Sequence, residues 1–192
     1  MNTFFARLSR MKYINRWGLM RNTITENIAE HSLEVSIIAH ALAVIGNTYF
    51  KKNYNEERLA VLAIYHDSTE IITGDMPTPI KYFAPEIRDA YKDVEFYATE
   101  ELLSGLPEEM IKSYRDILQP QKEDEPLWKF VKAADKLSAY VKCLEELSMG
   151  NEDFKQAFDT IGKTLIEMEI EEVDYFMEHF LPAYSLTIDE QA

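Results

Sequence analysis

The fold is decided first by the run NIAEHSLEVSIIAHALAVIGN at residues 27–47. Asn27 can cap a helix at its start, with the Glu30 side chain reaching back to the cap. The apolar residues that follow recur at helical spacing and form one stripe: Leu33, Ile37, Ile38, Ala41, Leu42 and Ile45. Gly46 and Asn47 are expected to end the helix. The run therefore predicts a long amphipathic helix with one face in a core.

The rest of the chain shows the same helical periodicity, and no alternating run rich in Val, Ile and Thr indicates a strand. Phe4, Phe5 and Leu8 predict a short N-terminal helix, and Asn55 can cap a helix that stops at Gly74. The prolines of DMPTP make segment 75–79 a stiff loop, because proline lacks an amide donor. Further helices are expected at residues 85–104, 107–118 and 126–148, with one or two more over 151–168 and 170–181. The sequence thus predicts an all-α fold.

Size and composition predict one soluble globular domain over residues 1–192. Of the 192 residues, 46% are hydrophobic and 28% charged, which is the balance of a packed protein. The longest uncharged run, residues 35–50, is shorter than the roughly 20 residues of a membrane span. Cys143 has no partner for an internal disulfide, so a cytoplasmic location is expected.

The charge is strongly negative but unevenly distributed. A net charge of -14 argues against binding nucleic acid or an anionic membrane. The residues before Glu26 are an exception, since they are basic and free of acids: Arg7, Arg10, Lys12, Arg16 and Arg21. This N-terminal segment could be a transit peptide or a docked helix, and we favour the docked helix.

Two of the 4 histidines lie on apolar helix faces. His31 is in line with Val35, Ile38 and Leu42, and His66 follows an apolar face of its own helix. Each imidazole should therefore point inward. A single such histidine is more often a core residue whose two nitrogens are bonded to neighbours.

Two acids accompany these histidines and favour a metal site. Asp67 directly follows His66, and Asp135 lies beside an apolar stripe of its helix, although a surface role near Lys132 or Lys136 is also open for it. Two imidazoles and two carboxylates suit zinc, manganese, cobalt or iron. Cys143 is not needed as a ligand and is expected to be a buried small hydrophobic residue.

The order His, His-Asp, Asp is the signature of the HD-domain phosphohydrolases. The chain resembles more closely the bacterial HD-domain 5'-deoxynucleotidases. Five ordered blocks carry this resemblance: INRWGLMRNT (14–23), TENIAEHS (25–32), YHDSTEIITGDMPTPIKYF (65–83), KAADKLSAYVKCLEEL (132–147) and DYFMEHFLP (174–182). The resemblance implies an HD-domain helical bundle with its metal-binding core at about 27–148 and C-terminal helices at 151–182.

The resemblance also implies roles for particular residues. One divalent metal ion, cobalt, manganese, zinc or similar, would be held by His31, His66, Asp67 and Asp135. Glu70 would be the catalytic acid, and its position one helical turn from His66 and Asp67 is sensible for that task. The residues expected to contact substrate are Arg16, Trp17, His31, Asp67, Asp75, Met76, Pro77, Thr78 and Asp135. Without the resemblance, Arg16 would be taken as a solvated charge and Trp17 as a core anchor.

The implied activity is hydrolysis of deoxyribonucleoside 5'-monophosphates to deoxynucleoside and phosphate. The alternatives are an HD-domain hydrolase of a nucleoside triphosphate or of guanosine tetraphosphate, and a degenerate HD domain kept as a binding module. The resemblance implies a homodimer as well, in which four bulky residues could be interface or core: Tyr175, Phe176, Met177 and Phe180. His40 and His179 have no motif around them and are expected to be surface or half-buried imidazoles.

Overall fold

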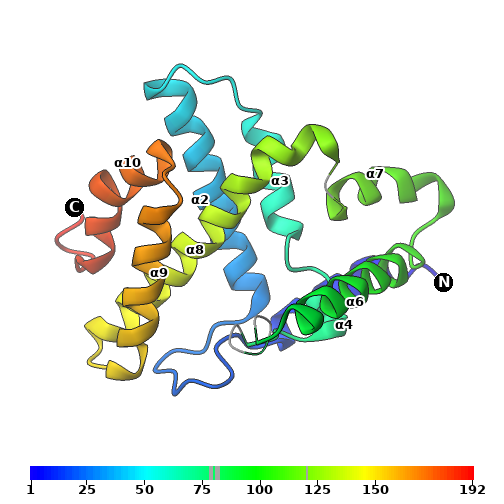
Figure 1. The fold of residues 1–192 in the computed structure, drawn as a ribbon, viewed down its shortest axis with the longest axis horizontal. Helices are drawn as coiled ribbons and strands as arrows, with labels where there is room; N and C mark the ends of the chain where they lie inside the picture. Colours follow the sequence, from blue (N-terminus) through cyan, green and yellow to red (C-terminus); the bar gives the residue numbers. More distant parts are fainter. Residues whose placement is uncertain (78–79, 81–82, 120) are drawn as a thin grey trace.

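The computed structural model describes residues 1–77, 80, 83–119 and 121–192, and the described residues have an all-α architecture (Figure 1). The described residues form no strand, only an isolated bridge between Asn15 and Asn27. The helices are α1 (Phe4–Leu8), α2 (Ile28–Tyr49), α3 (Glu56–Tyr65), α4 (Glu70–Thr73), α6 (Pro85–Leu103), α7 (Glu108–Leu118), α8 (Glu125–Ser148), α9 (Lys155–Glu167) and α10 (Glu171–His179). Short 3-10 helices are η1 (Ser9–Tyr13), η2 (Lys122–Asp124), η3 (Glu152–Phe154) and η4 (Leu181–Ser185).

Helices α2 and α8 cross at the centre of the molecule, with α9 and α10 on one side and α6 and α7 on the other (Figure 1). Their inner faces share one large apolar cluster with α3, α9 and α10. A smaller cluster around Phe4, Leu102 and Leu103 fixes the N-terminal helix against α6 and α7. The N-terminus is therefore a docked helix in this structure, as the favoured interpretation expected.

The start of α2 is as predicted, but its end and its buried face are not. Asn27 accepts hydrogen bonds from the amides of Ala29 (3.0 Å) and Glu30 (3.1 Å), and its own amide donates to Glu30 Oε2 (3.2 Å), which completes the capping box. Gly46 does not end α2, which continues to Tyr49. Gly46 instead lies at a point of close packing. A Cβ atom there would lie 2.5 Å from the Tyr54 ring.

The apolar stripe of α2 is rotated from the one first expected. Leu33 and Ile37 are exposed (55% and 62%), whereas Val35, Ile38 and Leu42 are buried in line with His31. The buried side is therefore the histidine-bearing side. Half of the most apolar window of α2 is buried within the fold, so its length and apolar composition fit a central core helix.

The predicted helix from Asn55 to Gly74 is interrupted at the residues of greatest interest. Helix α3 ends at Tyr65, and α4 begins only at Glu70. Between them, the His66 ring bonds to the Ala63 carbonyl (2.7 Å) and the Ser68 hydroxyl donates to the Tyr65 carbonyl (2.7 Å). These side chains compete with the backbone for the carbonyl groups at the helix end, which favours a turn.

The remaining helix predictions agree with the structure to within a few residues at each end. Of the predicted loop at 75–79, residues 78 and 79 lie outside the described residues. Helices α6, α7 and α8 match the segments expected there, and η3, α9 and α10 match the C-terminal segments. Cys143 is buried, as expected, and His40 and His179 are exposed. Phe176 is a core residue, while Phe180 is 46% exposed.

Candidate functional site

Three of the four predicted metal ligands come together beside the first turn of α2. The candidate ligand atoms of His31, His66 and Asp67 all lie within 4.8 Å of one another. Asp67 Oδ2 is 3.1 Å from His66 Nε2 and 3.6 Å from His31 Nε2. His31 is supplied by α2, and the other two come from the turn that interrupts the helix after Tyr65. The break in the predicted helix therefore places His66 and Asp67 opposite His31.

Asp135, the fourth predicted ligand, reaches the edge of this group from the middle of α8. Its Oδ1 lies 3.2 Å from His31 Nε2, although Asp135 is not part of the tight group of three. Its Oδ2 lies 3.3 Å from Lys136 Nζ, so the surface pairing and the site contact are both present. Burial alone would raise the pKa of Asp135, but the adjacent His31 ring and the Lys136 charge hold it well below its usual range. Asp135 therefore offers a carboxylate to the site.

Both imidazoles present Nε2 to the space between them. In His66, Nδ1 bonds to the Ala63 carbonyl, which can only accept, so the proton is on Nδ1. Within the described part of the chain, neither Nε2 has a partner with hydrogen-bond geometry, although both atoms are buried. Burial, followed by the nearby Arg16 charge, lowers the pKa of His31 to about 4, so its ring is neutral at pH 7.

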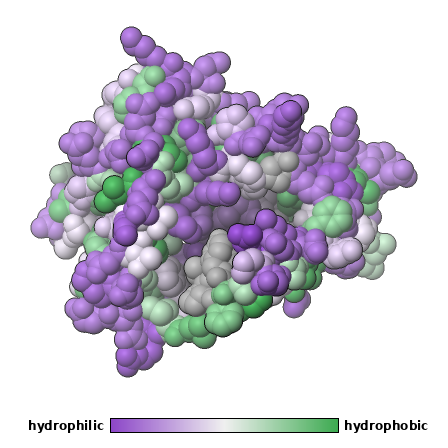
Figure 2. All heavy atoms as spheres, in the orientation of Figure 1, coloured by the Kyte–Doolittle hydropathy of each residue, from purple (hydrophilic) through white to green (hydrophobic). Residues whose placement is uncertain are grey.

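These features fit a divalent metal ion. The alternative of an ordinary core histidine, with both nitrogens hydrogen-bonded, does not fit His31 or His66. Among the described residues, only Nδ1 of each ring has a hydrogen-bond partner. Neutral imidazole nitrogens and ionised carboxylates are the donors such ions prefer. Figure 2 shows that the face seen in the view of Figure 1 is mostly hydrophilic and is hollowed near its middle.

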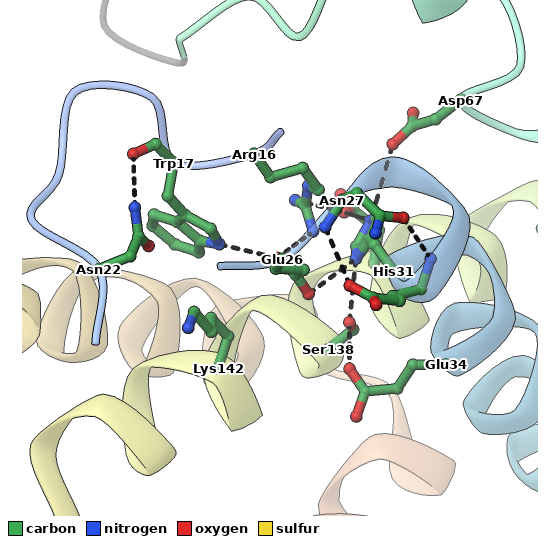
Figure 3. A network of polar contacts seen from close by, with 12 residues as sticks. Arg16, Trp17, Asn22, Glu26, Asn27, His31, Glu34, Asp67, Ser138 and Lys142 are labelled. Atoms are coloured by element: carbon green, nitrogen blue, oxygen red, sulfur yellow. Dashed lines mark hydrogen bonds and ion pairs between the residues drawn. The ribbon is translucent and has the colours of Figure 1, made fainter. Parts of the chain in front are cut away.

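Arg16 and Trp17 lie next to this group, on the segment that leads into α2 (Figure 3). Arg16 Nη1 is 3.3 Å from Glu26 Oε2, and its Nη2 is 3.8 Å from Asp135 Oδ1. The Arg16 side chain is only 13% exposed, so it is not a solvated surface charge. Trp17 Nε1 donates to the same Glu26 oxygen (3.0 Å), and its ring packs on Phe154 with centroids 5.2 Å apart.

The backbone of Trp17 is in the left-handed region, with φ of +58°. Such a conformation is unfavourable for a bulky residue and persists only where the surroundings enforce it. Here the Glu26 carboxylate and the Phe154 ring hold the indole on either side. Glu26 is thus a structural part of the site that the sequence motifs did not single out.

Glu146 fixes the same N-terminal segment onto α8, and sequence reasoning missed it too. Its carboxylate accepts hydrogen bonds from the amides of Thr23 (2.9 Å) and Ile24 (3.2 Å) and from Asn151 Nδ2 (2.7 Å). It also pairs with the buried Lys142 ammonium, which donates to the Ile24 carbonyl (2.5 Å). Although burial alone would raise it, these bonds lower the pKa of Glu146 to about 2.

We expect Glu146→Gln to destabilise the protein by about 3–5 kcal/mol at pH 7, because Lys142 would be left buried without its counter-charge. The depressed pKa means that this contribution is complete above the ordinary pKa of 4.5 and disappears as the pH falls towards about 2. Urea denaturation of both proteins between pH 7 and pH 2 measures the difference. Glu145→Gln, an exposed neighbour, is the matched control and should change stability by less than about 0.5 kcal/mol. An equal effect of both substitutions would contradict this role for Glu146.

The predicted catalytic acid and substrate loop follow directly after the ligand turn. Glu70 is the first residue of α4, and its amide donates to the Asp67 carbonyl (3.0 Å). Asp75, Met76 and Pro77 come after α4, while Thr78 lies outside the described residues. Burial raises the pKa of Asp75, and the charge of Arg16 partly opposes that shift. Asp75 is therefore on the Arg16 side of the site.

Comparison with known proteins places this arrangement in one family. The model of the family described as "5'-deoxynucleotidase YfbR-like" matches residues 3–184. The chain is 53% identical over 190 residues to the 5'-deoxynucleotidase yfbR of Photorhabdus temperata, covering 99% of this chain and 96% of that one. It is 50% identical over 187 residues to a 5'-deoxynucleotidase of Erwinia tasmaniensis, covering 97% and 94%.

Solved structures agree on the fold. An HD-domain phosphohydrolase of Listeria innocua superimposes with a TM-score of 0.83 at 26% identity, covering 98% of this chain and 91% of that one. The cyanophage S-2L HD phosphohydrolase DatZ, bound to dA and one catalytic Zn²⁺ ion, has a TM-score of 0.65 at 19% identity, covering 95% and 96%. The chain therefore belongs to the YfbR-like 5'-deoxynucleotidase family of HD-domain phosphohydrolases.

Proposed function

We propose that this protein hydrolyses deoxyribonucleoside 5'-monophosphates with one divalent metal ion held by His31, His66, Asp67 and Asp135. The observation that carries the proposal is a pair of buried Nε2 atoms with no hydrogen-bond partner among the described residues. They converge with Asp67 next to the buried Arg16 guanidinium. A bound metal ion would supply electrostatic stabilisation of phosphoryl oxygens and a more acidic water. We infer cobalt, manganese or zinc from the mixture of nitrogen and oxygen donors.

The side chains around the metal ligands bind the substrate and transfer the proton. Arg16 holds a phosphate oxygen, because a guanidinium presents paired donors to phosphate. Glu70 transfers a proton, either from the attacking water or to the leaving 5' oxygen. Asp75, Met76 and Pro77 line the nucleoside side of the site, and Trp17 provides a flat apolar wall against the deoxyribose.

The test is phosphate release from a panel of nucleotides by protein that has been stripped with a chelator and resupplied with cobalt, manganese, zinc or magnesium. We expect deoxyribonucleoside 5'-monophosphates to be hydrolysed only after a metal is restored. The 3'-monophosphates should be inert. Release of pyrophosphate or triphosphate would instead favour one of the alternative HD-domain hydrolases, and no release from any nucleotide would favour a degenerate binding module.

We expect the wild type to prefer dAMP over AMP, and Trp17→Ala to reduce this preference about 5- to 150-fold. The physical reason is that a 2'-hydroxyl buried against the indole without a partner costs about 1–3 kcal/mol. The measurement is the ratio of kcat/KM values for dAMP and AMP. Trp128→Phe is the control, since Trp128 packs against the main apolar cluster. Equal turnover of dAMP and AMP by the wild type would exclude this role for Trp17.

The enzyme is further proposed to act as a cytoplasmic homodimer with no nucleic-acid or membrane partner. The net charge of -14 supports the absence of polyanionic partners. The exposed Phe180, close to the end of α10, is available for a subunit contact. Sedimentation of the purified protein measures its oligomeric state, and we expect the mass of a dimer.

A further inference from the structure

A series of hydrogen-bonded side chains leads from His31 on α2 to Glu34. His31 Nδ1 lies 3.0 Å from Ser138 Oγ, and the Ser138 hydroxyl donates to Glu34 Oε2 at 2.5 Å (Figure 3). Glu34 is one turn after His31 on α2, and Ser138 is one turn after Asp135 on α8. His31 and Ser138 are both completely buried. These hydrogen bonds therefore link α2 and α8 next to the candidate metal site.

The direction of the hydrogen bonds follows from the number of protons available. The Glu34 carboxylate can only accept, so the single hydroxyl proton of Ser138 is used on Glu34. The Ser138 oxygen must then accept from Nδ1–H of His31. Glu26 Oε1, the other acid near this nitrogen, is 3.9 Å away and outside hydrogen-bond range. In the neutral ring, a proton on Nδ1 leaves the lone pair on Nε2, which is the atom that faces Asp67 and Asp135.

We propose that Ser138 and Glu34 are positioning residues that hold His31 in the tautomer and ring orientation required for metal binding. The inference rests on the proposed metal site. His66 obtains the same tautomer from a main-chain carbonyl, that of Ala63, which no side-chain substitution removes. His31 depends on side chains from two helices. Loss of such an outer partner typically weakens metal binding about 10- to 100-fold.

The protein offers a closely matched control for the Ser138 substitution. Ser32 is buried (1% exposed), adjacent to His31, and its hydroxyl has no hydrogen-bond partner among the described residues. Ser138→Ala and Ser32→Ala therefore remove a hydroxyl group from equally buried positions, but only Ser138→Ala interrupts the hydrogen bonds between His31 and Glu34. Glu34→Gln keeps a carbonyl acceptor for the Ser138 hydroxyl, whereas Glu34→Ala removes it.

The experiment titrates cobalt and manganese into the metal-stripped full-length proteins and measures the dissociation constants by calorimetry. We expect Ser138→Ala to raise the constant about 10- to 100-fold and Ser32→Ala to leave it unchanged. Glu34→Ala should weaken binding more than Glu34→Gln does. Long-range ¹⁵N–¹H spectra of the metal-free wild type should show the His31 proton on Nδ1, and Ser138→Ala should give a mixture of tautomers.

Equal metal affinity of the Ser138→Ala and Ser32→Ala proteins, or a wild-type His31 protonated on Nε2, would overturn the proposal. If Ser138→Ala does not fold, the comparison of the two Glu34 variants decides, because Glu34 is only half-buried. Failure of the metal site itself has a different signature: the wild type and His66→Ala would bind the metals equally weakly. That result would overturn the proposed function together with this inference.

Discussion

Replacing His66 with alanine is expected to lower phosphate release from dAMP by more than about 10³-fold, because a metal ion contributes several kcal/mol to such a reaction. The substitution removes the Nε2 atom that lies 3.1 Å from Asp67 Oδ2. Metal content after dialysis and the rate of phosphate release should therefore fall together.

His40→Ala is the appropriate control for this experiment. His40 is an exposed histidine on α2, outside the predicted site, and its loss should change neither metal content nor rate. Circular dichroism of both variants checks that the helices are retained. Activity that survives in His66→Ala would show that the phosphatase resides elsewhere in the preparation.

Replacing Glu70 with glutamine is expected to lower kcat about 10²- to 10⁴-fold while metal binding is preserved, which is the range for removal of a general acid or base. Glutamine keeps the size of the side chain but cannot transfer the proton. The position of Glu70, one residue beyond the ligand turn and bonded through its amide to Asp67, should be unaffected because that bond is made by the backbone. Steady-state kinetics with dAMP and metal titration measure the two effects separately.

Glu57→Gln provides the matched change at an exposed acid of α3 and should leave kcat unaltered. In the pH profile of kcat, the Glu70→Gln protein should lack one of the ionisations seen in the wild type. If the variant lost its metal along with its activity, Glu70 would be a ligand and not the proton-transferring group. An unchanged kcat would remove Glu70 from the mechanism.

The elements that sequence patterns predicted well are those with local end signals. Asn27 begins α2 through a capping box, and Pro85 begins α6, because both signals act within one helical turn. The predicted end of α2 is wrong because Gly46 does not act as a helix stop. Gly46 instead allows the Tyr54 ring to pack against the helix backbone, a contact that a helical pattern does not report.

The candidate site was predictable to the extent that its residues lie in motifs. His31, His66 and Asp67 converge as expected, and Asp135 reaches the edge of the group. Glu146 was missed because its partner Thr23 is 123 residues away in the sequence. Glu26 was missed because its bond to Trp17 is made within an irregular segment, which has no periodic pattern to read. The turn at His66 was missed because it is formed by side-chain bonds to carbonyl groups, which helical periodicity does not report.

The crossing of α2 and α8 at the centre of the molecule has a consequence for how this protein can change. The two helices that form most of the hydrophobic interior also carry His31 and Asp135, so a repacked core would displace ligands. The other two candidate ligands, on the turn after α3, are attached less directly to that interior. Laboratory evolution towards new substrates should therefore proceed more readily through the turn, the Asp75 loop and the Trp17 segment than through the crossing helices.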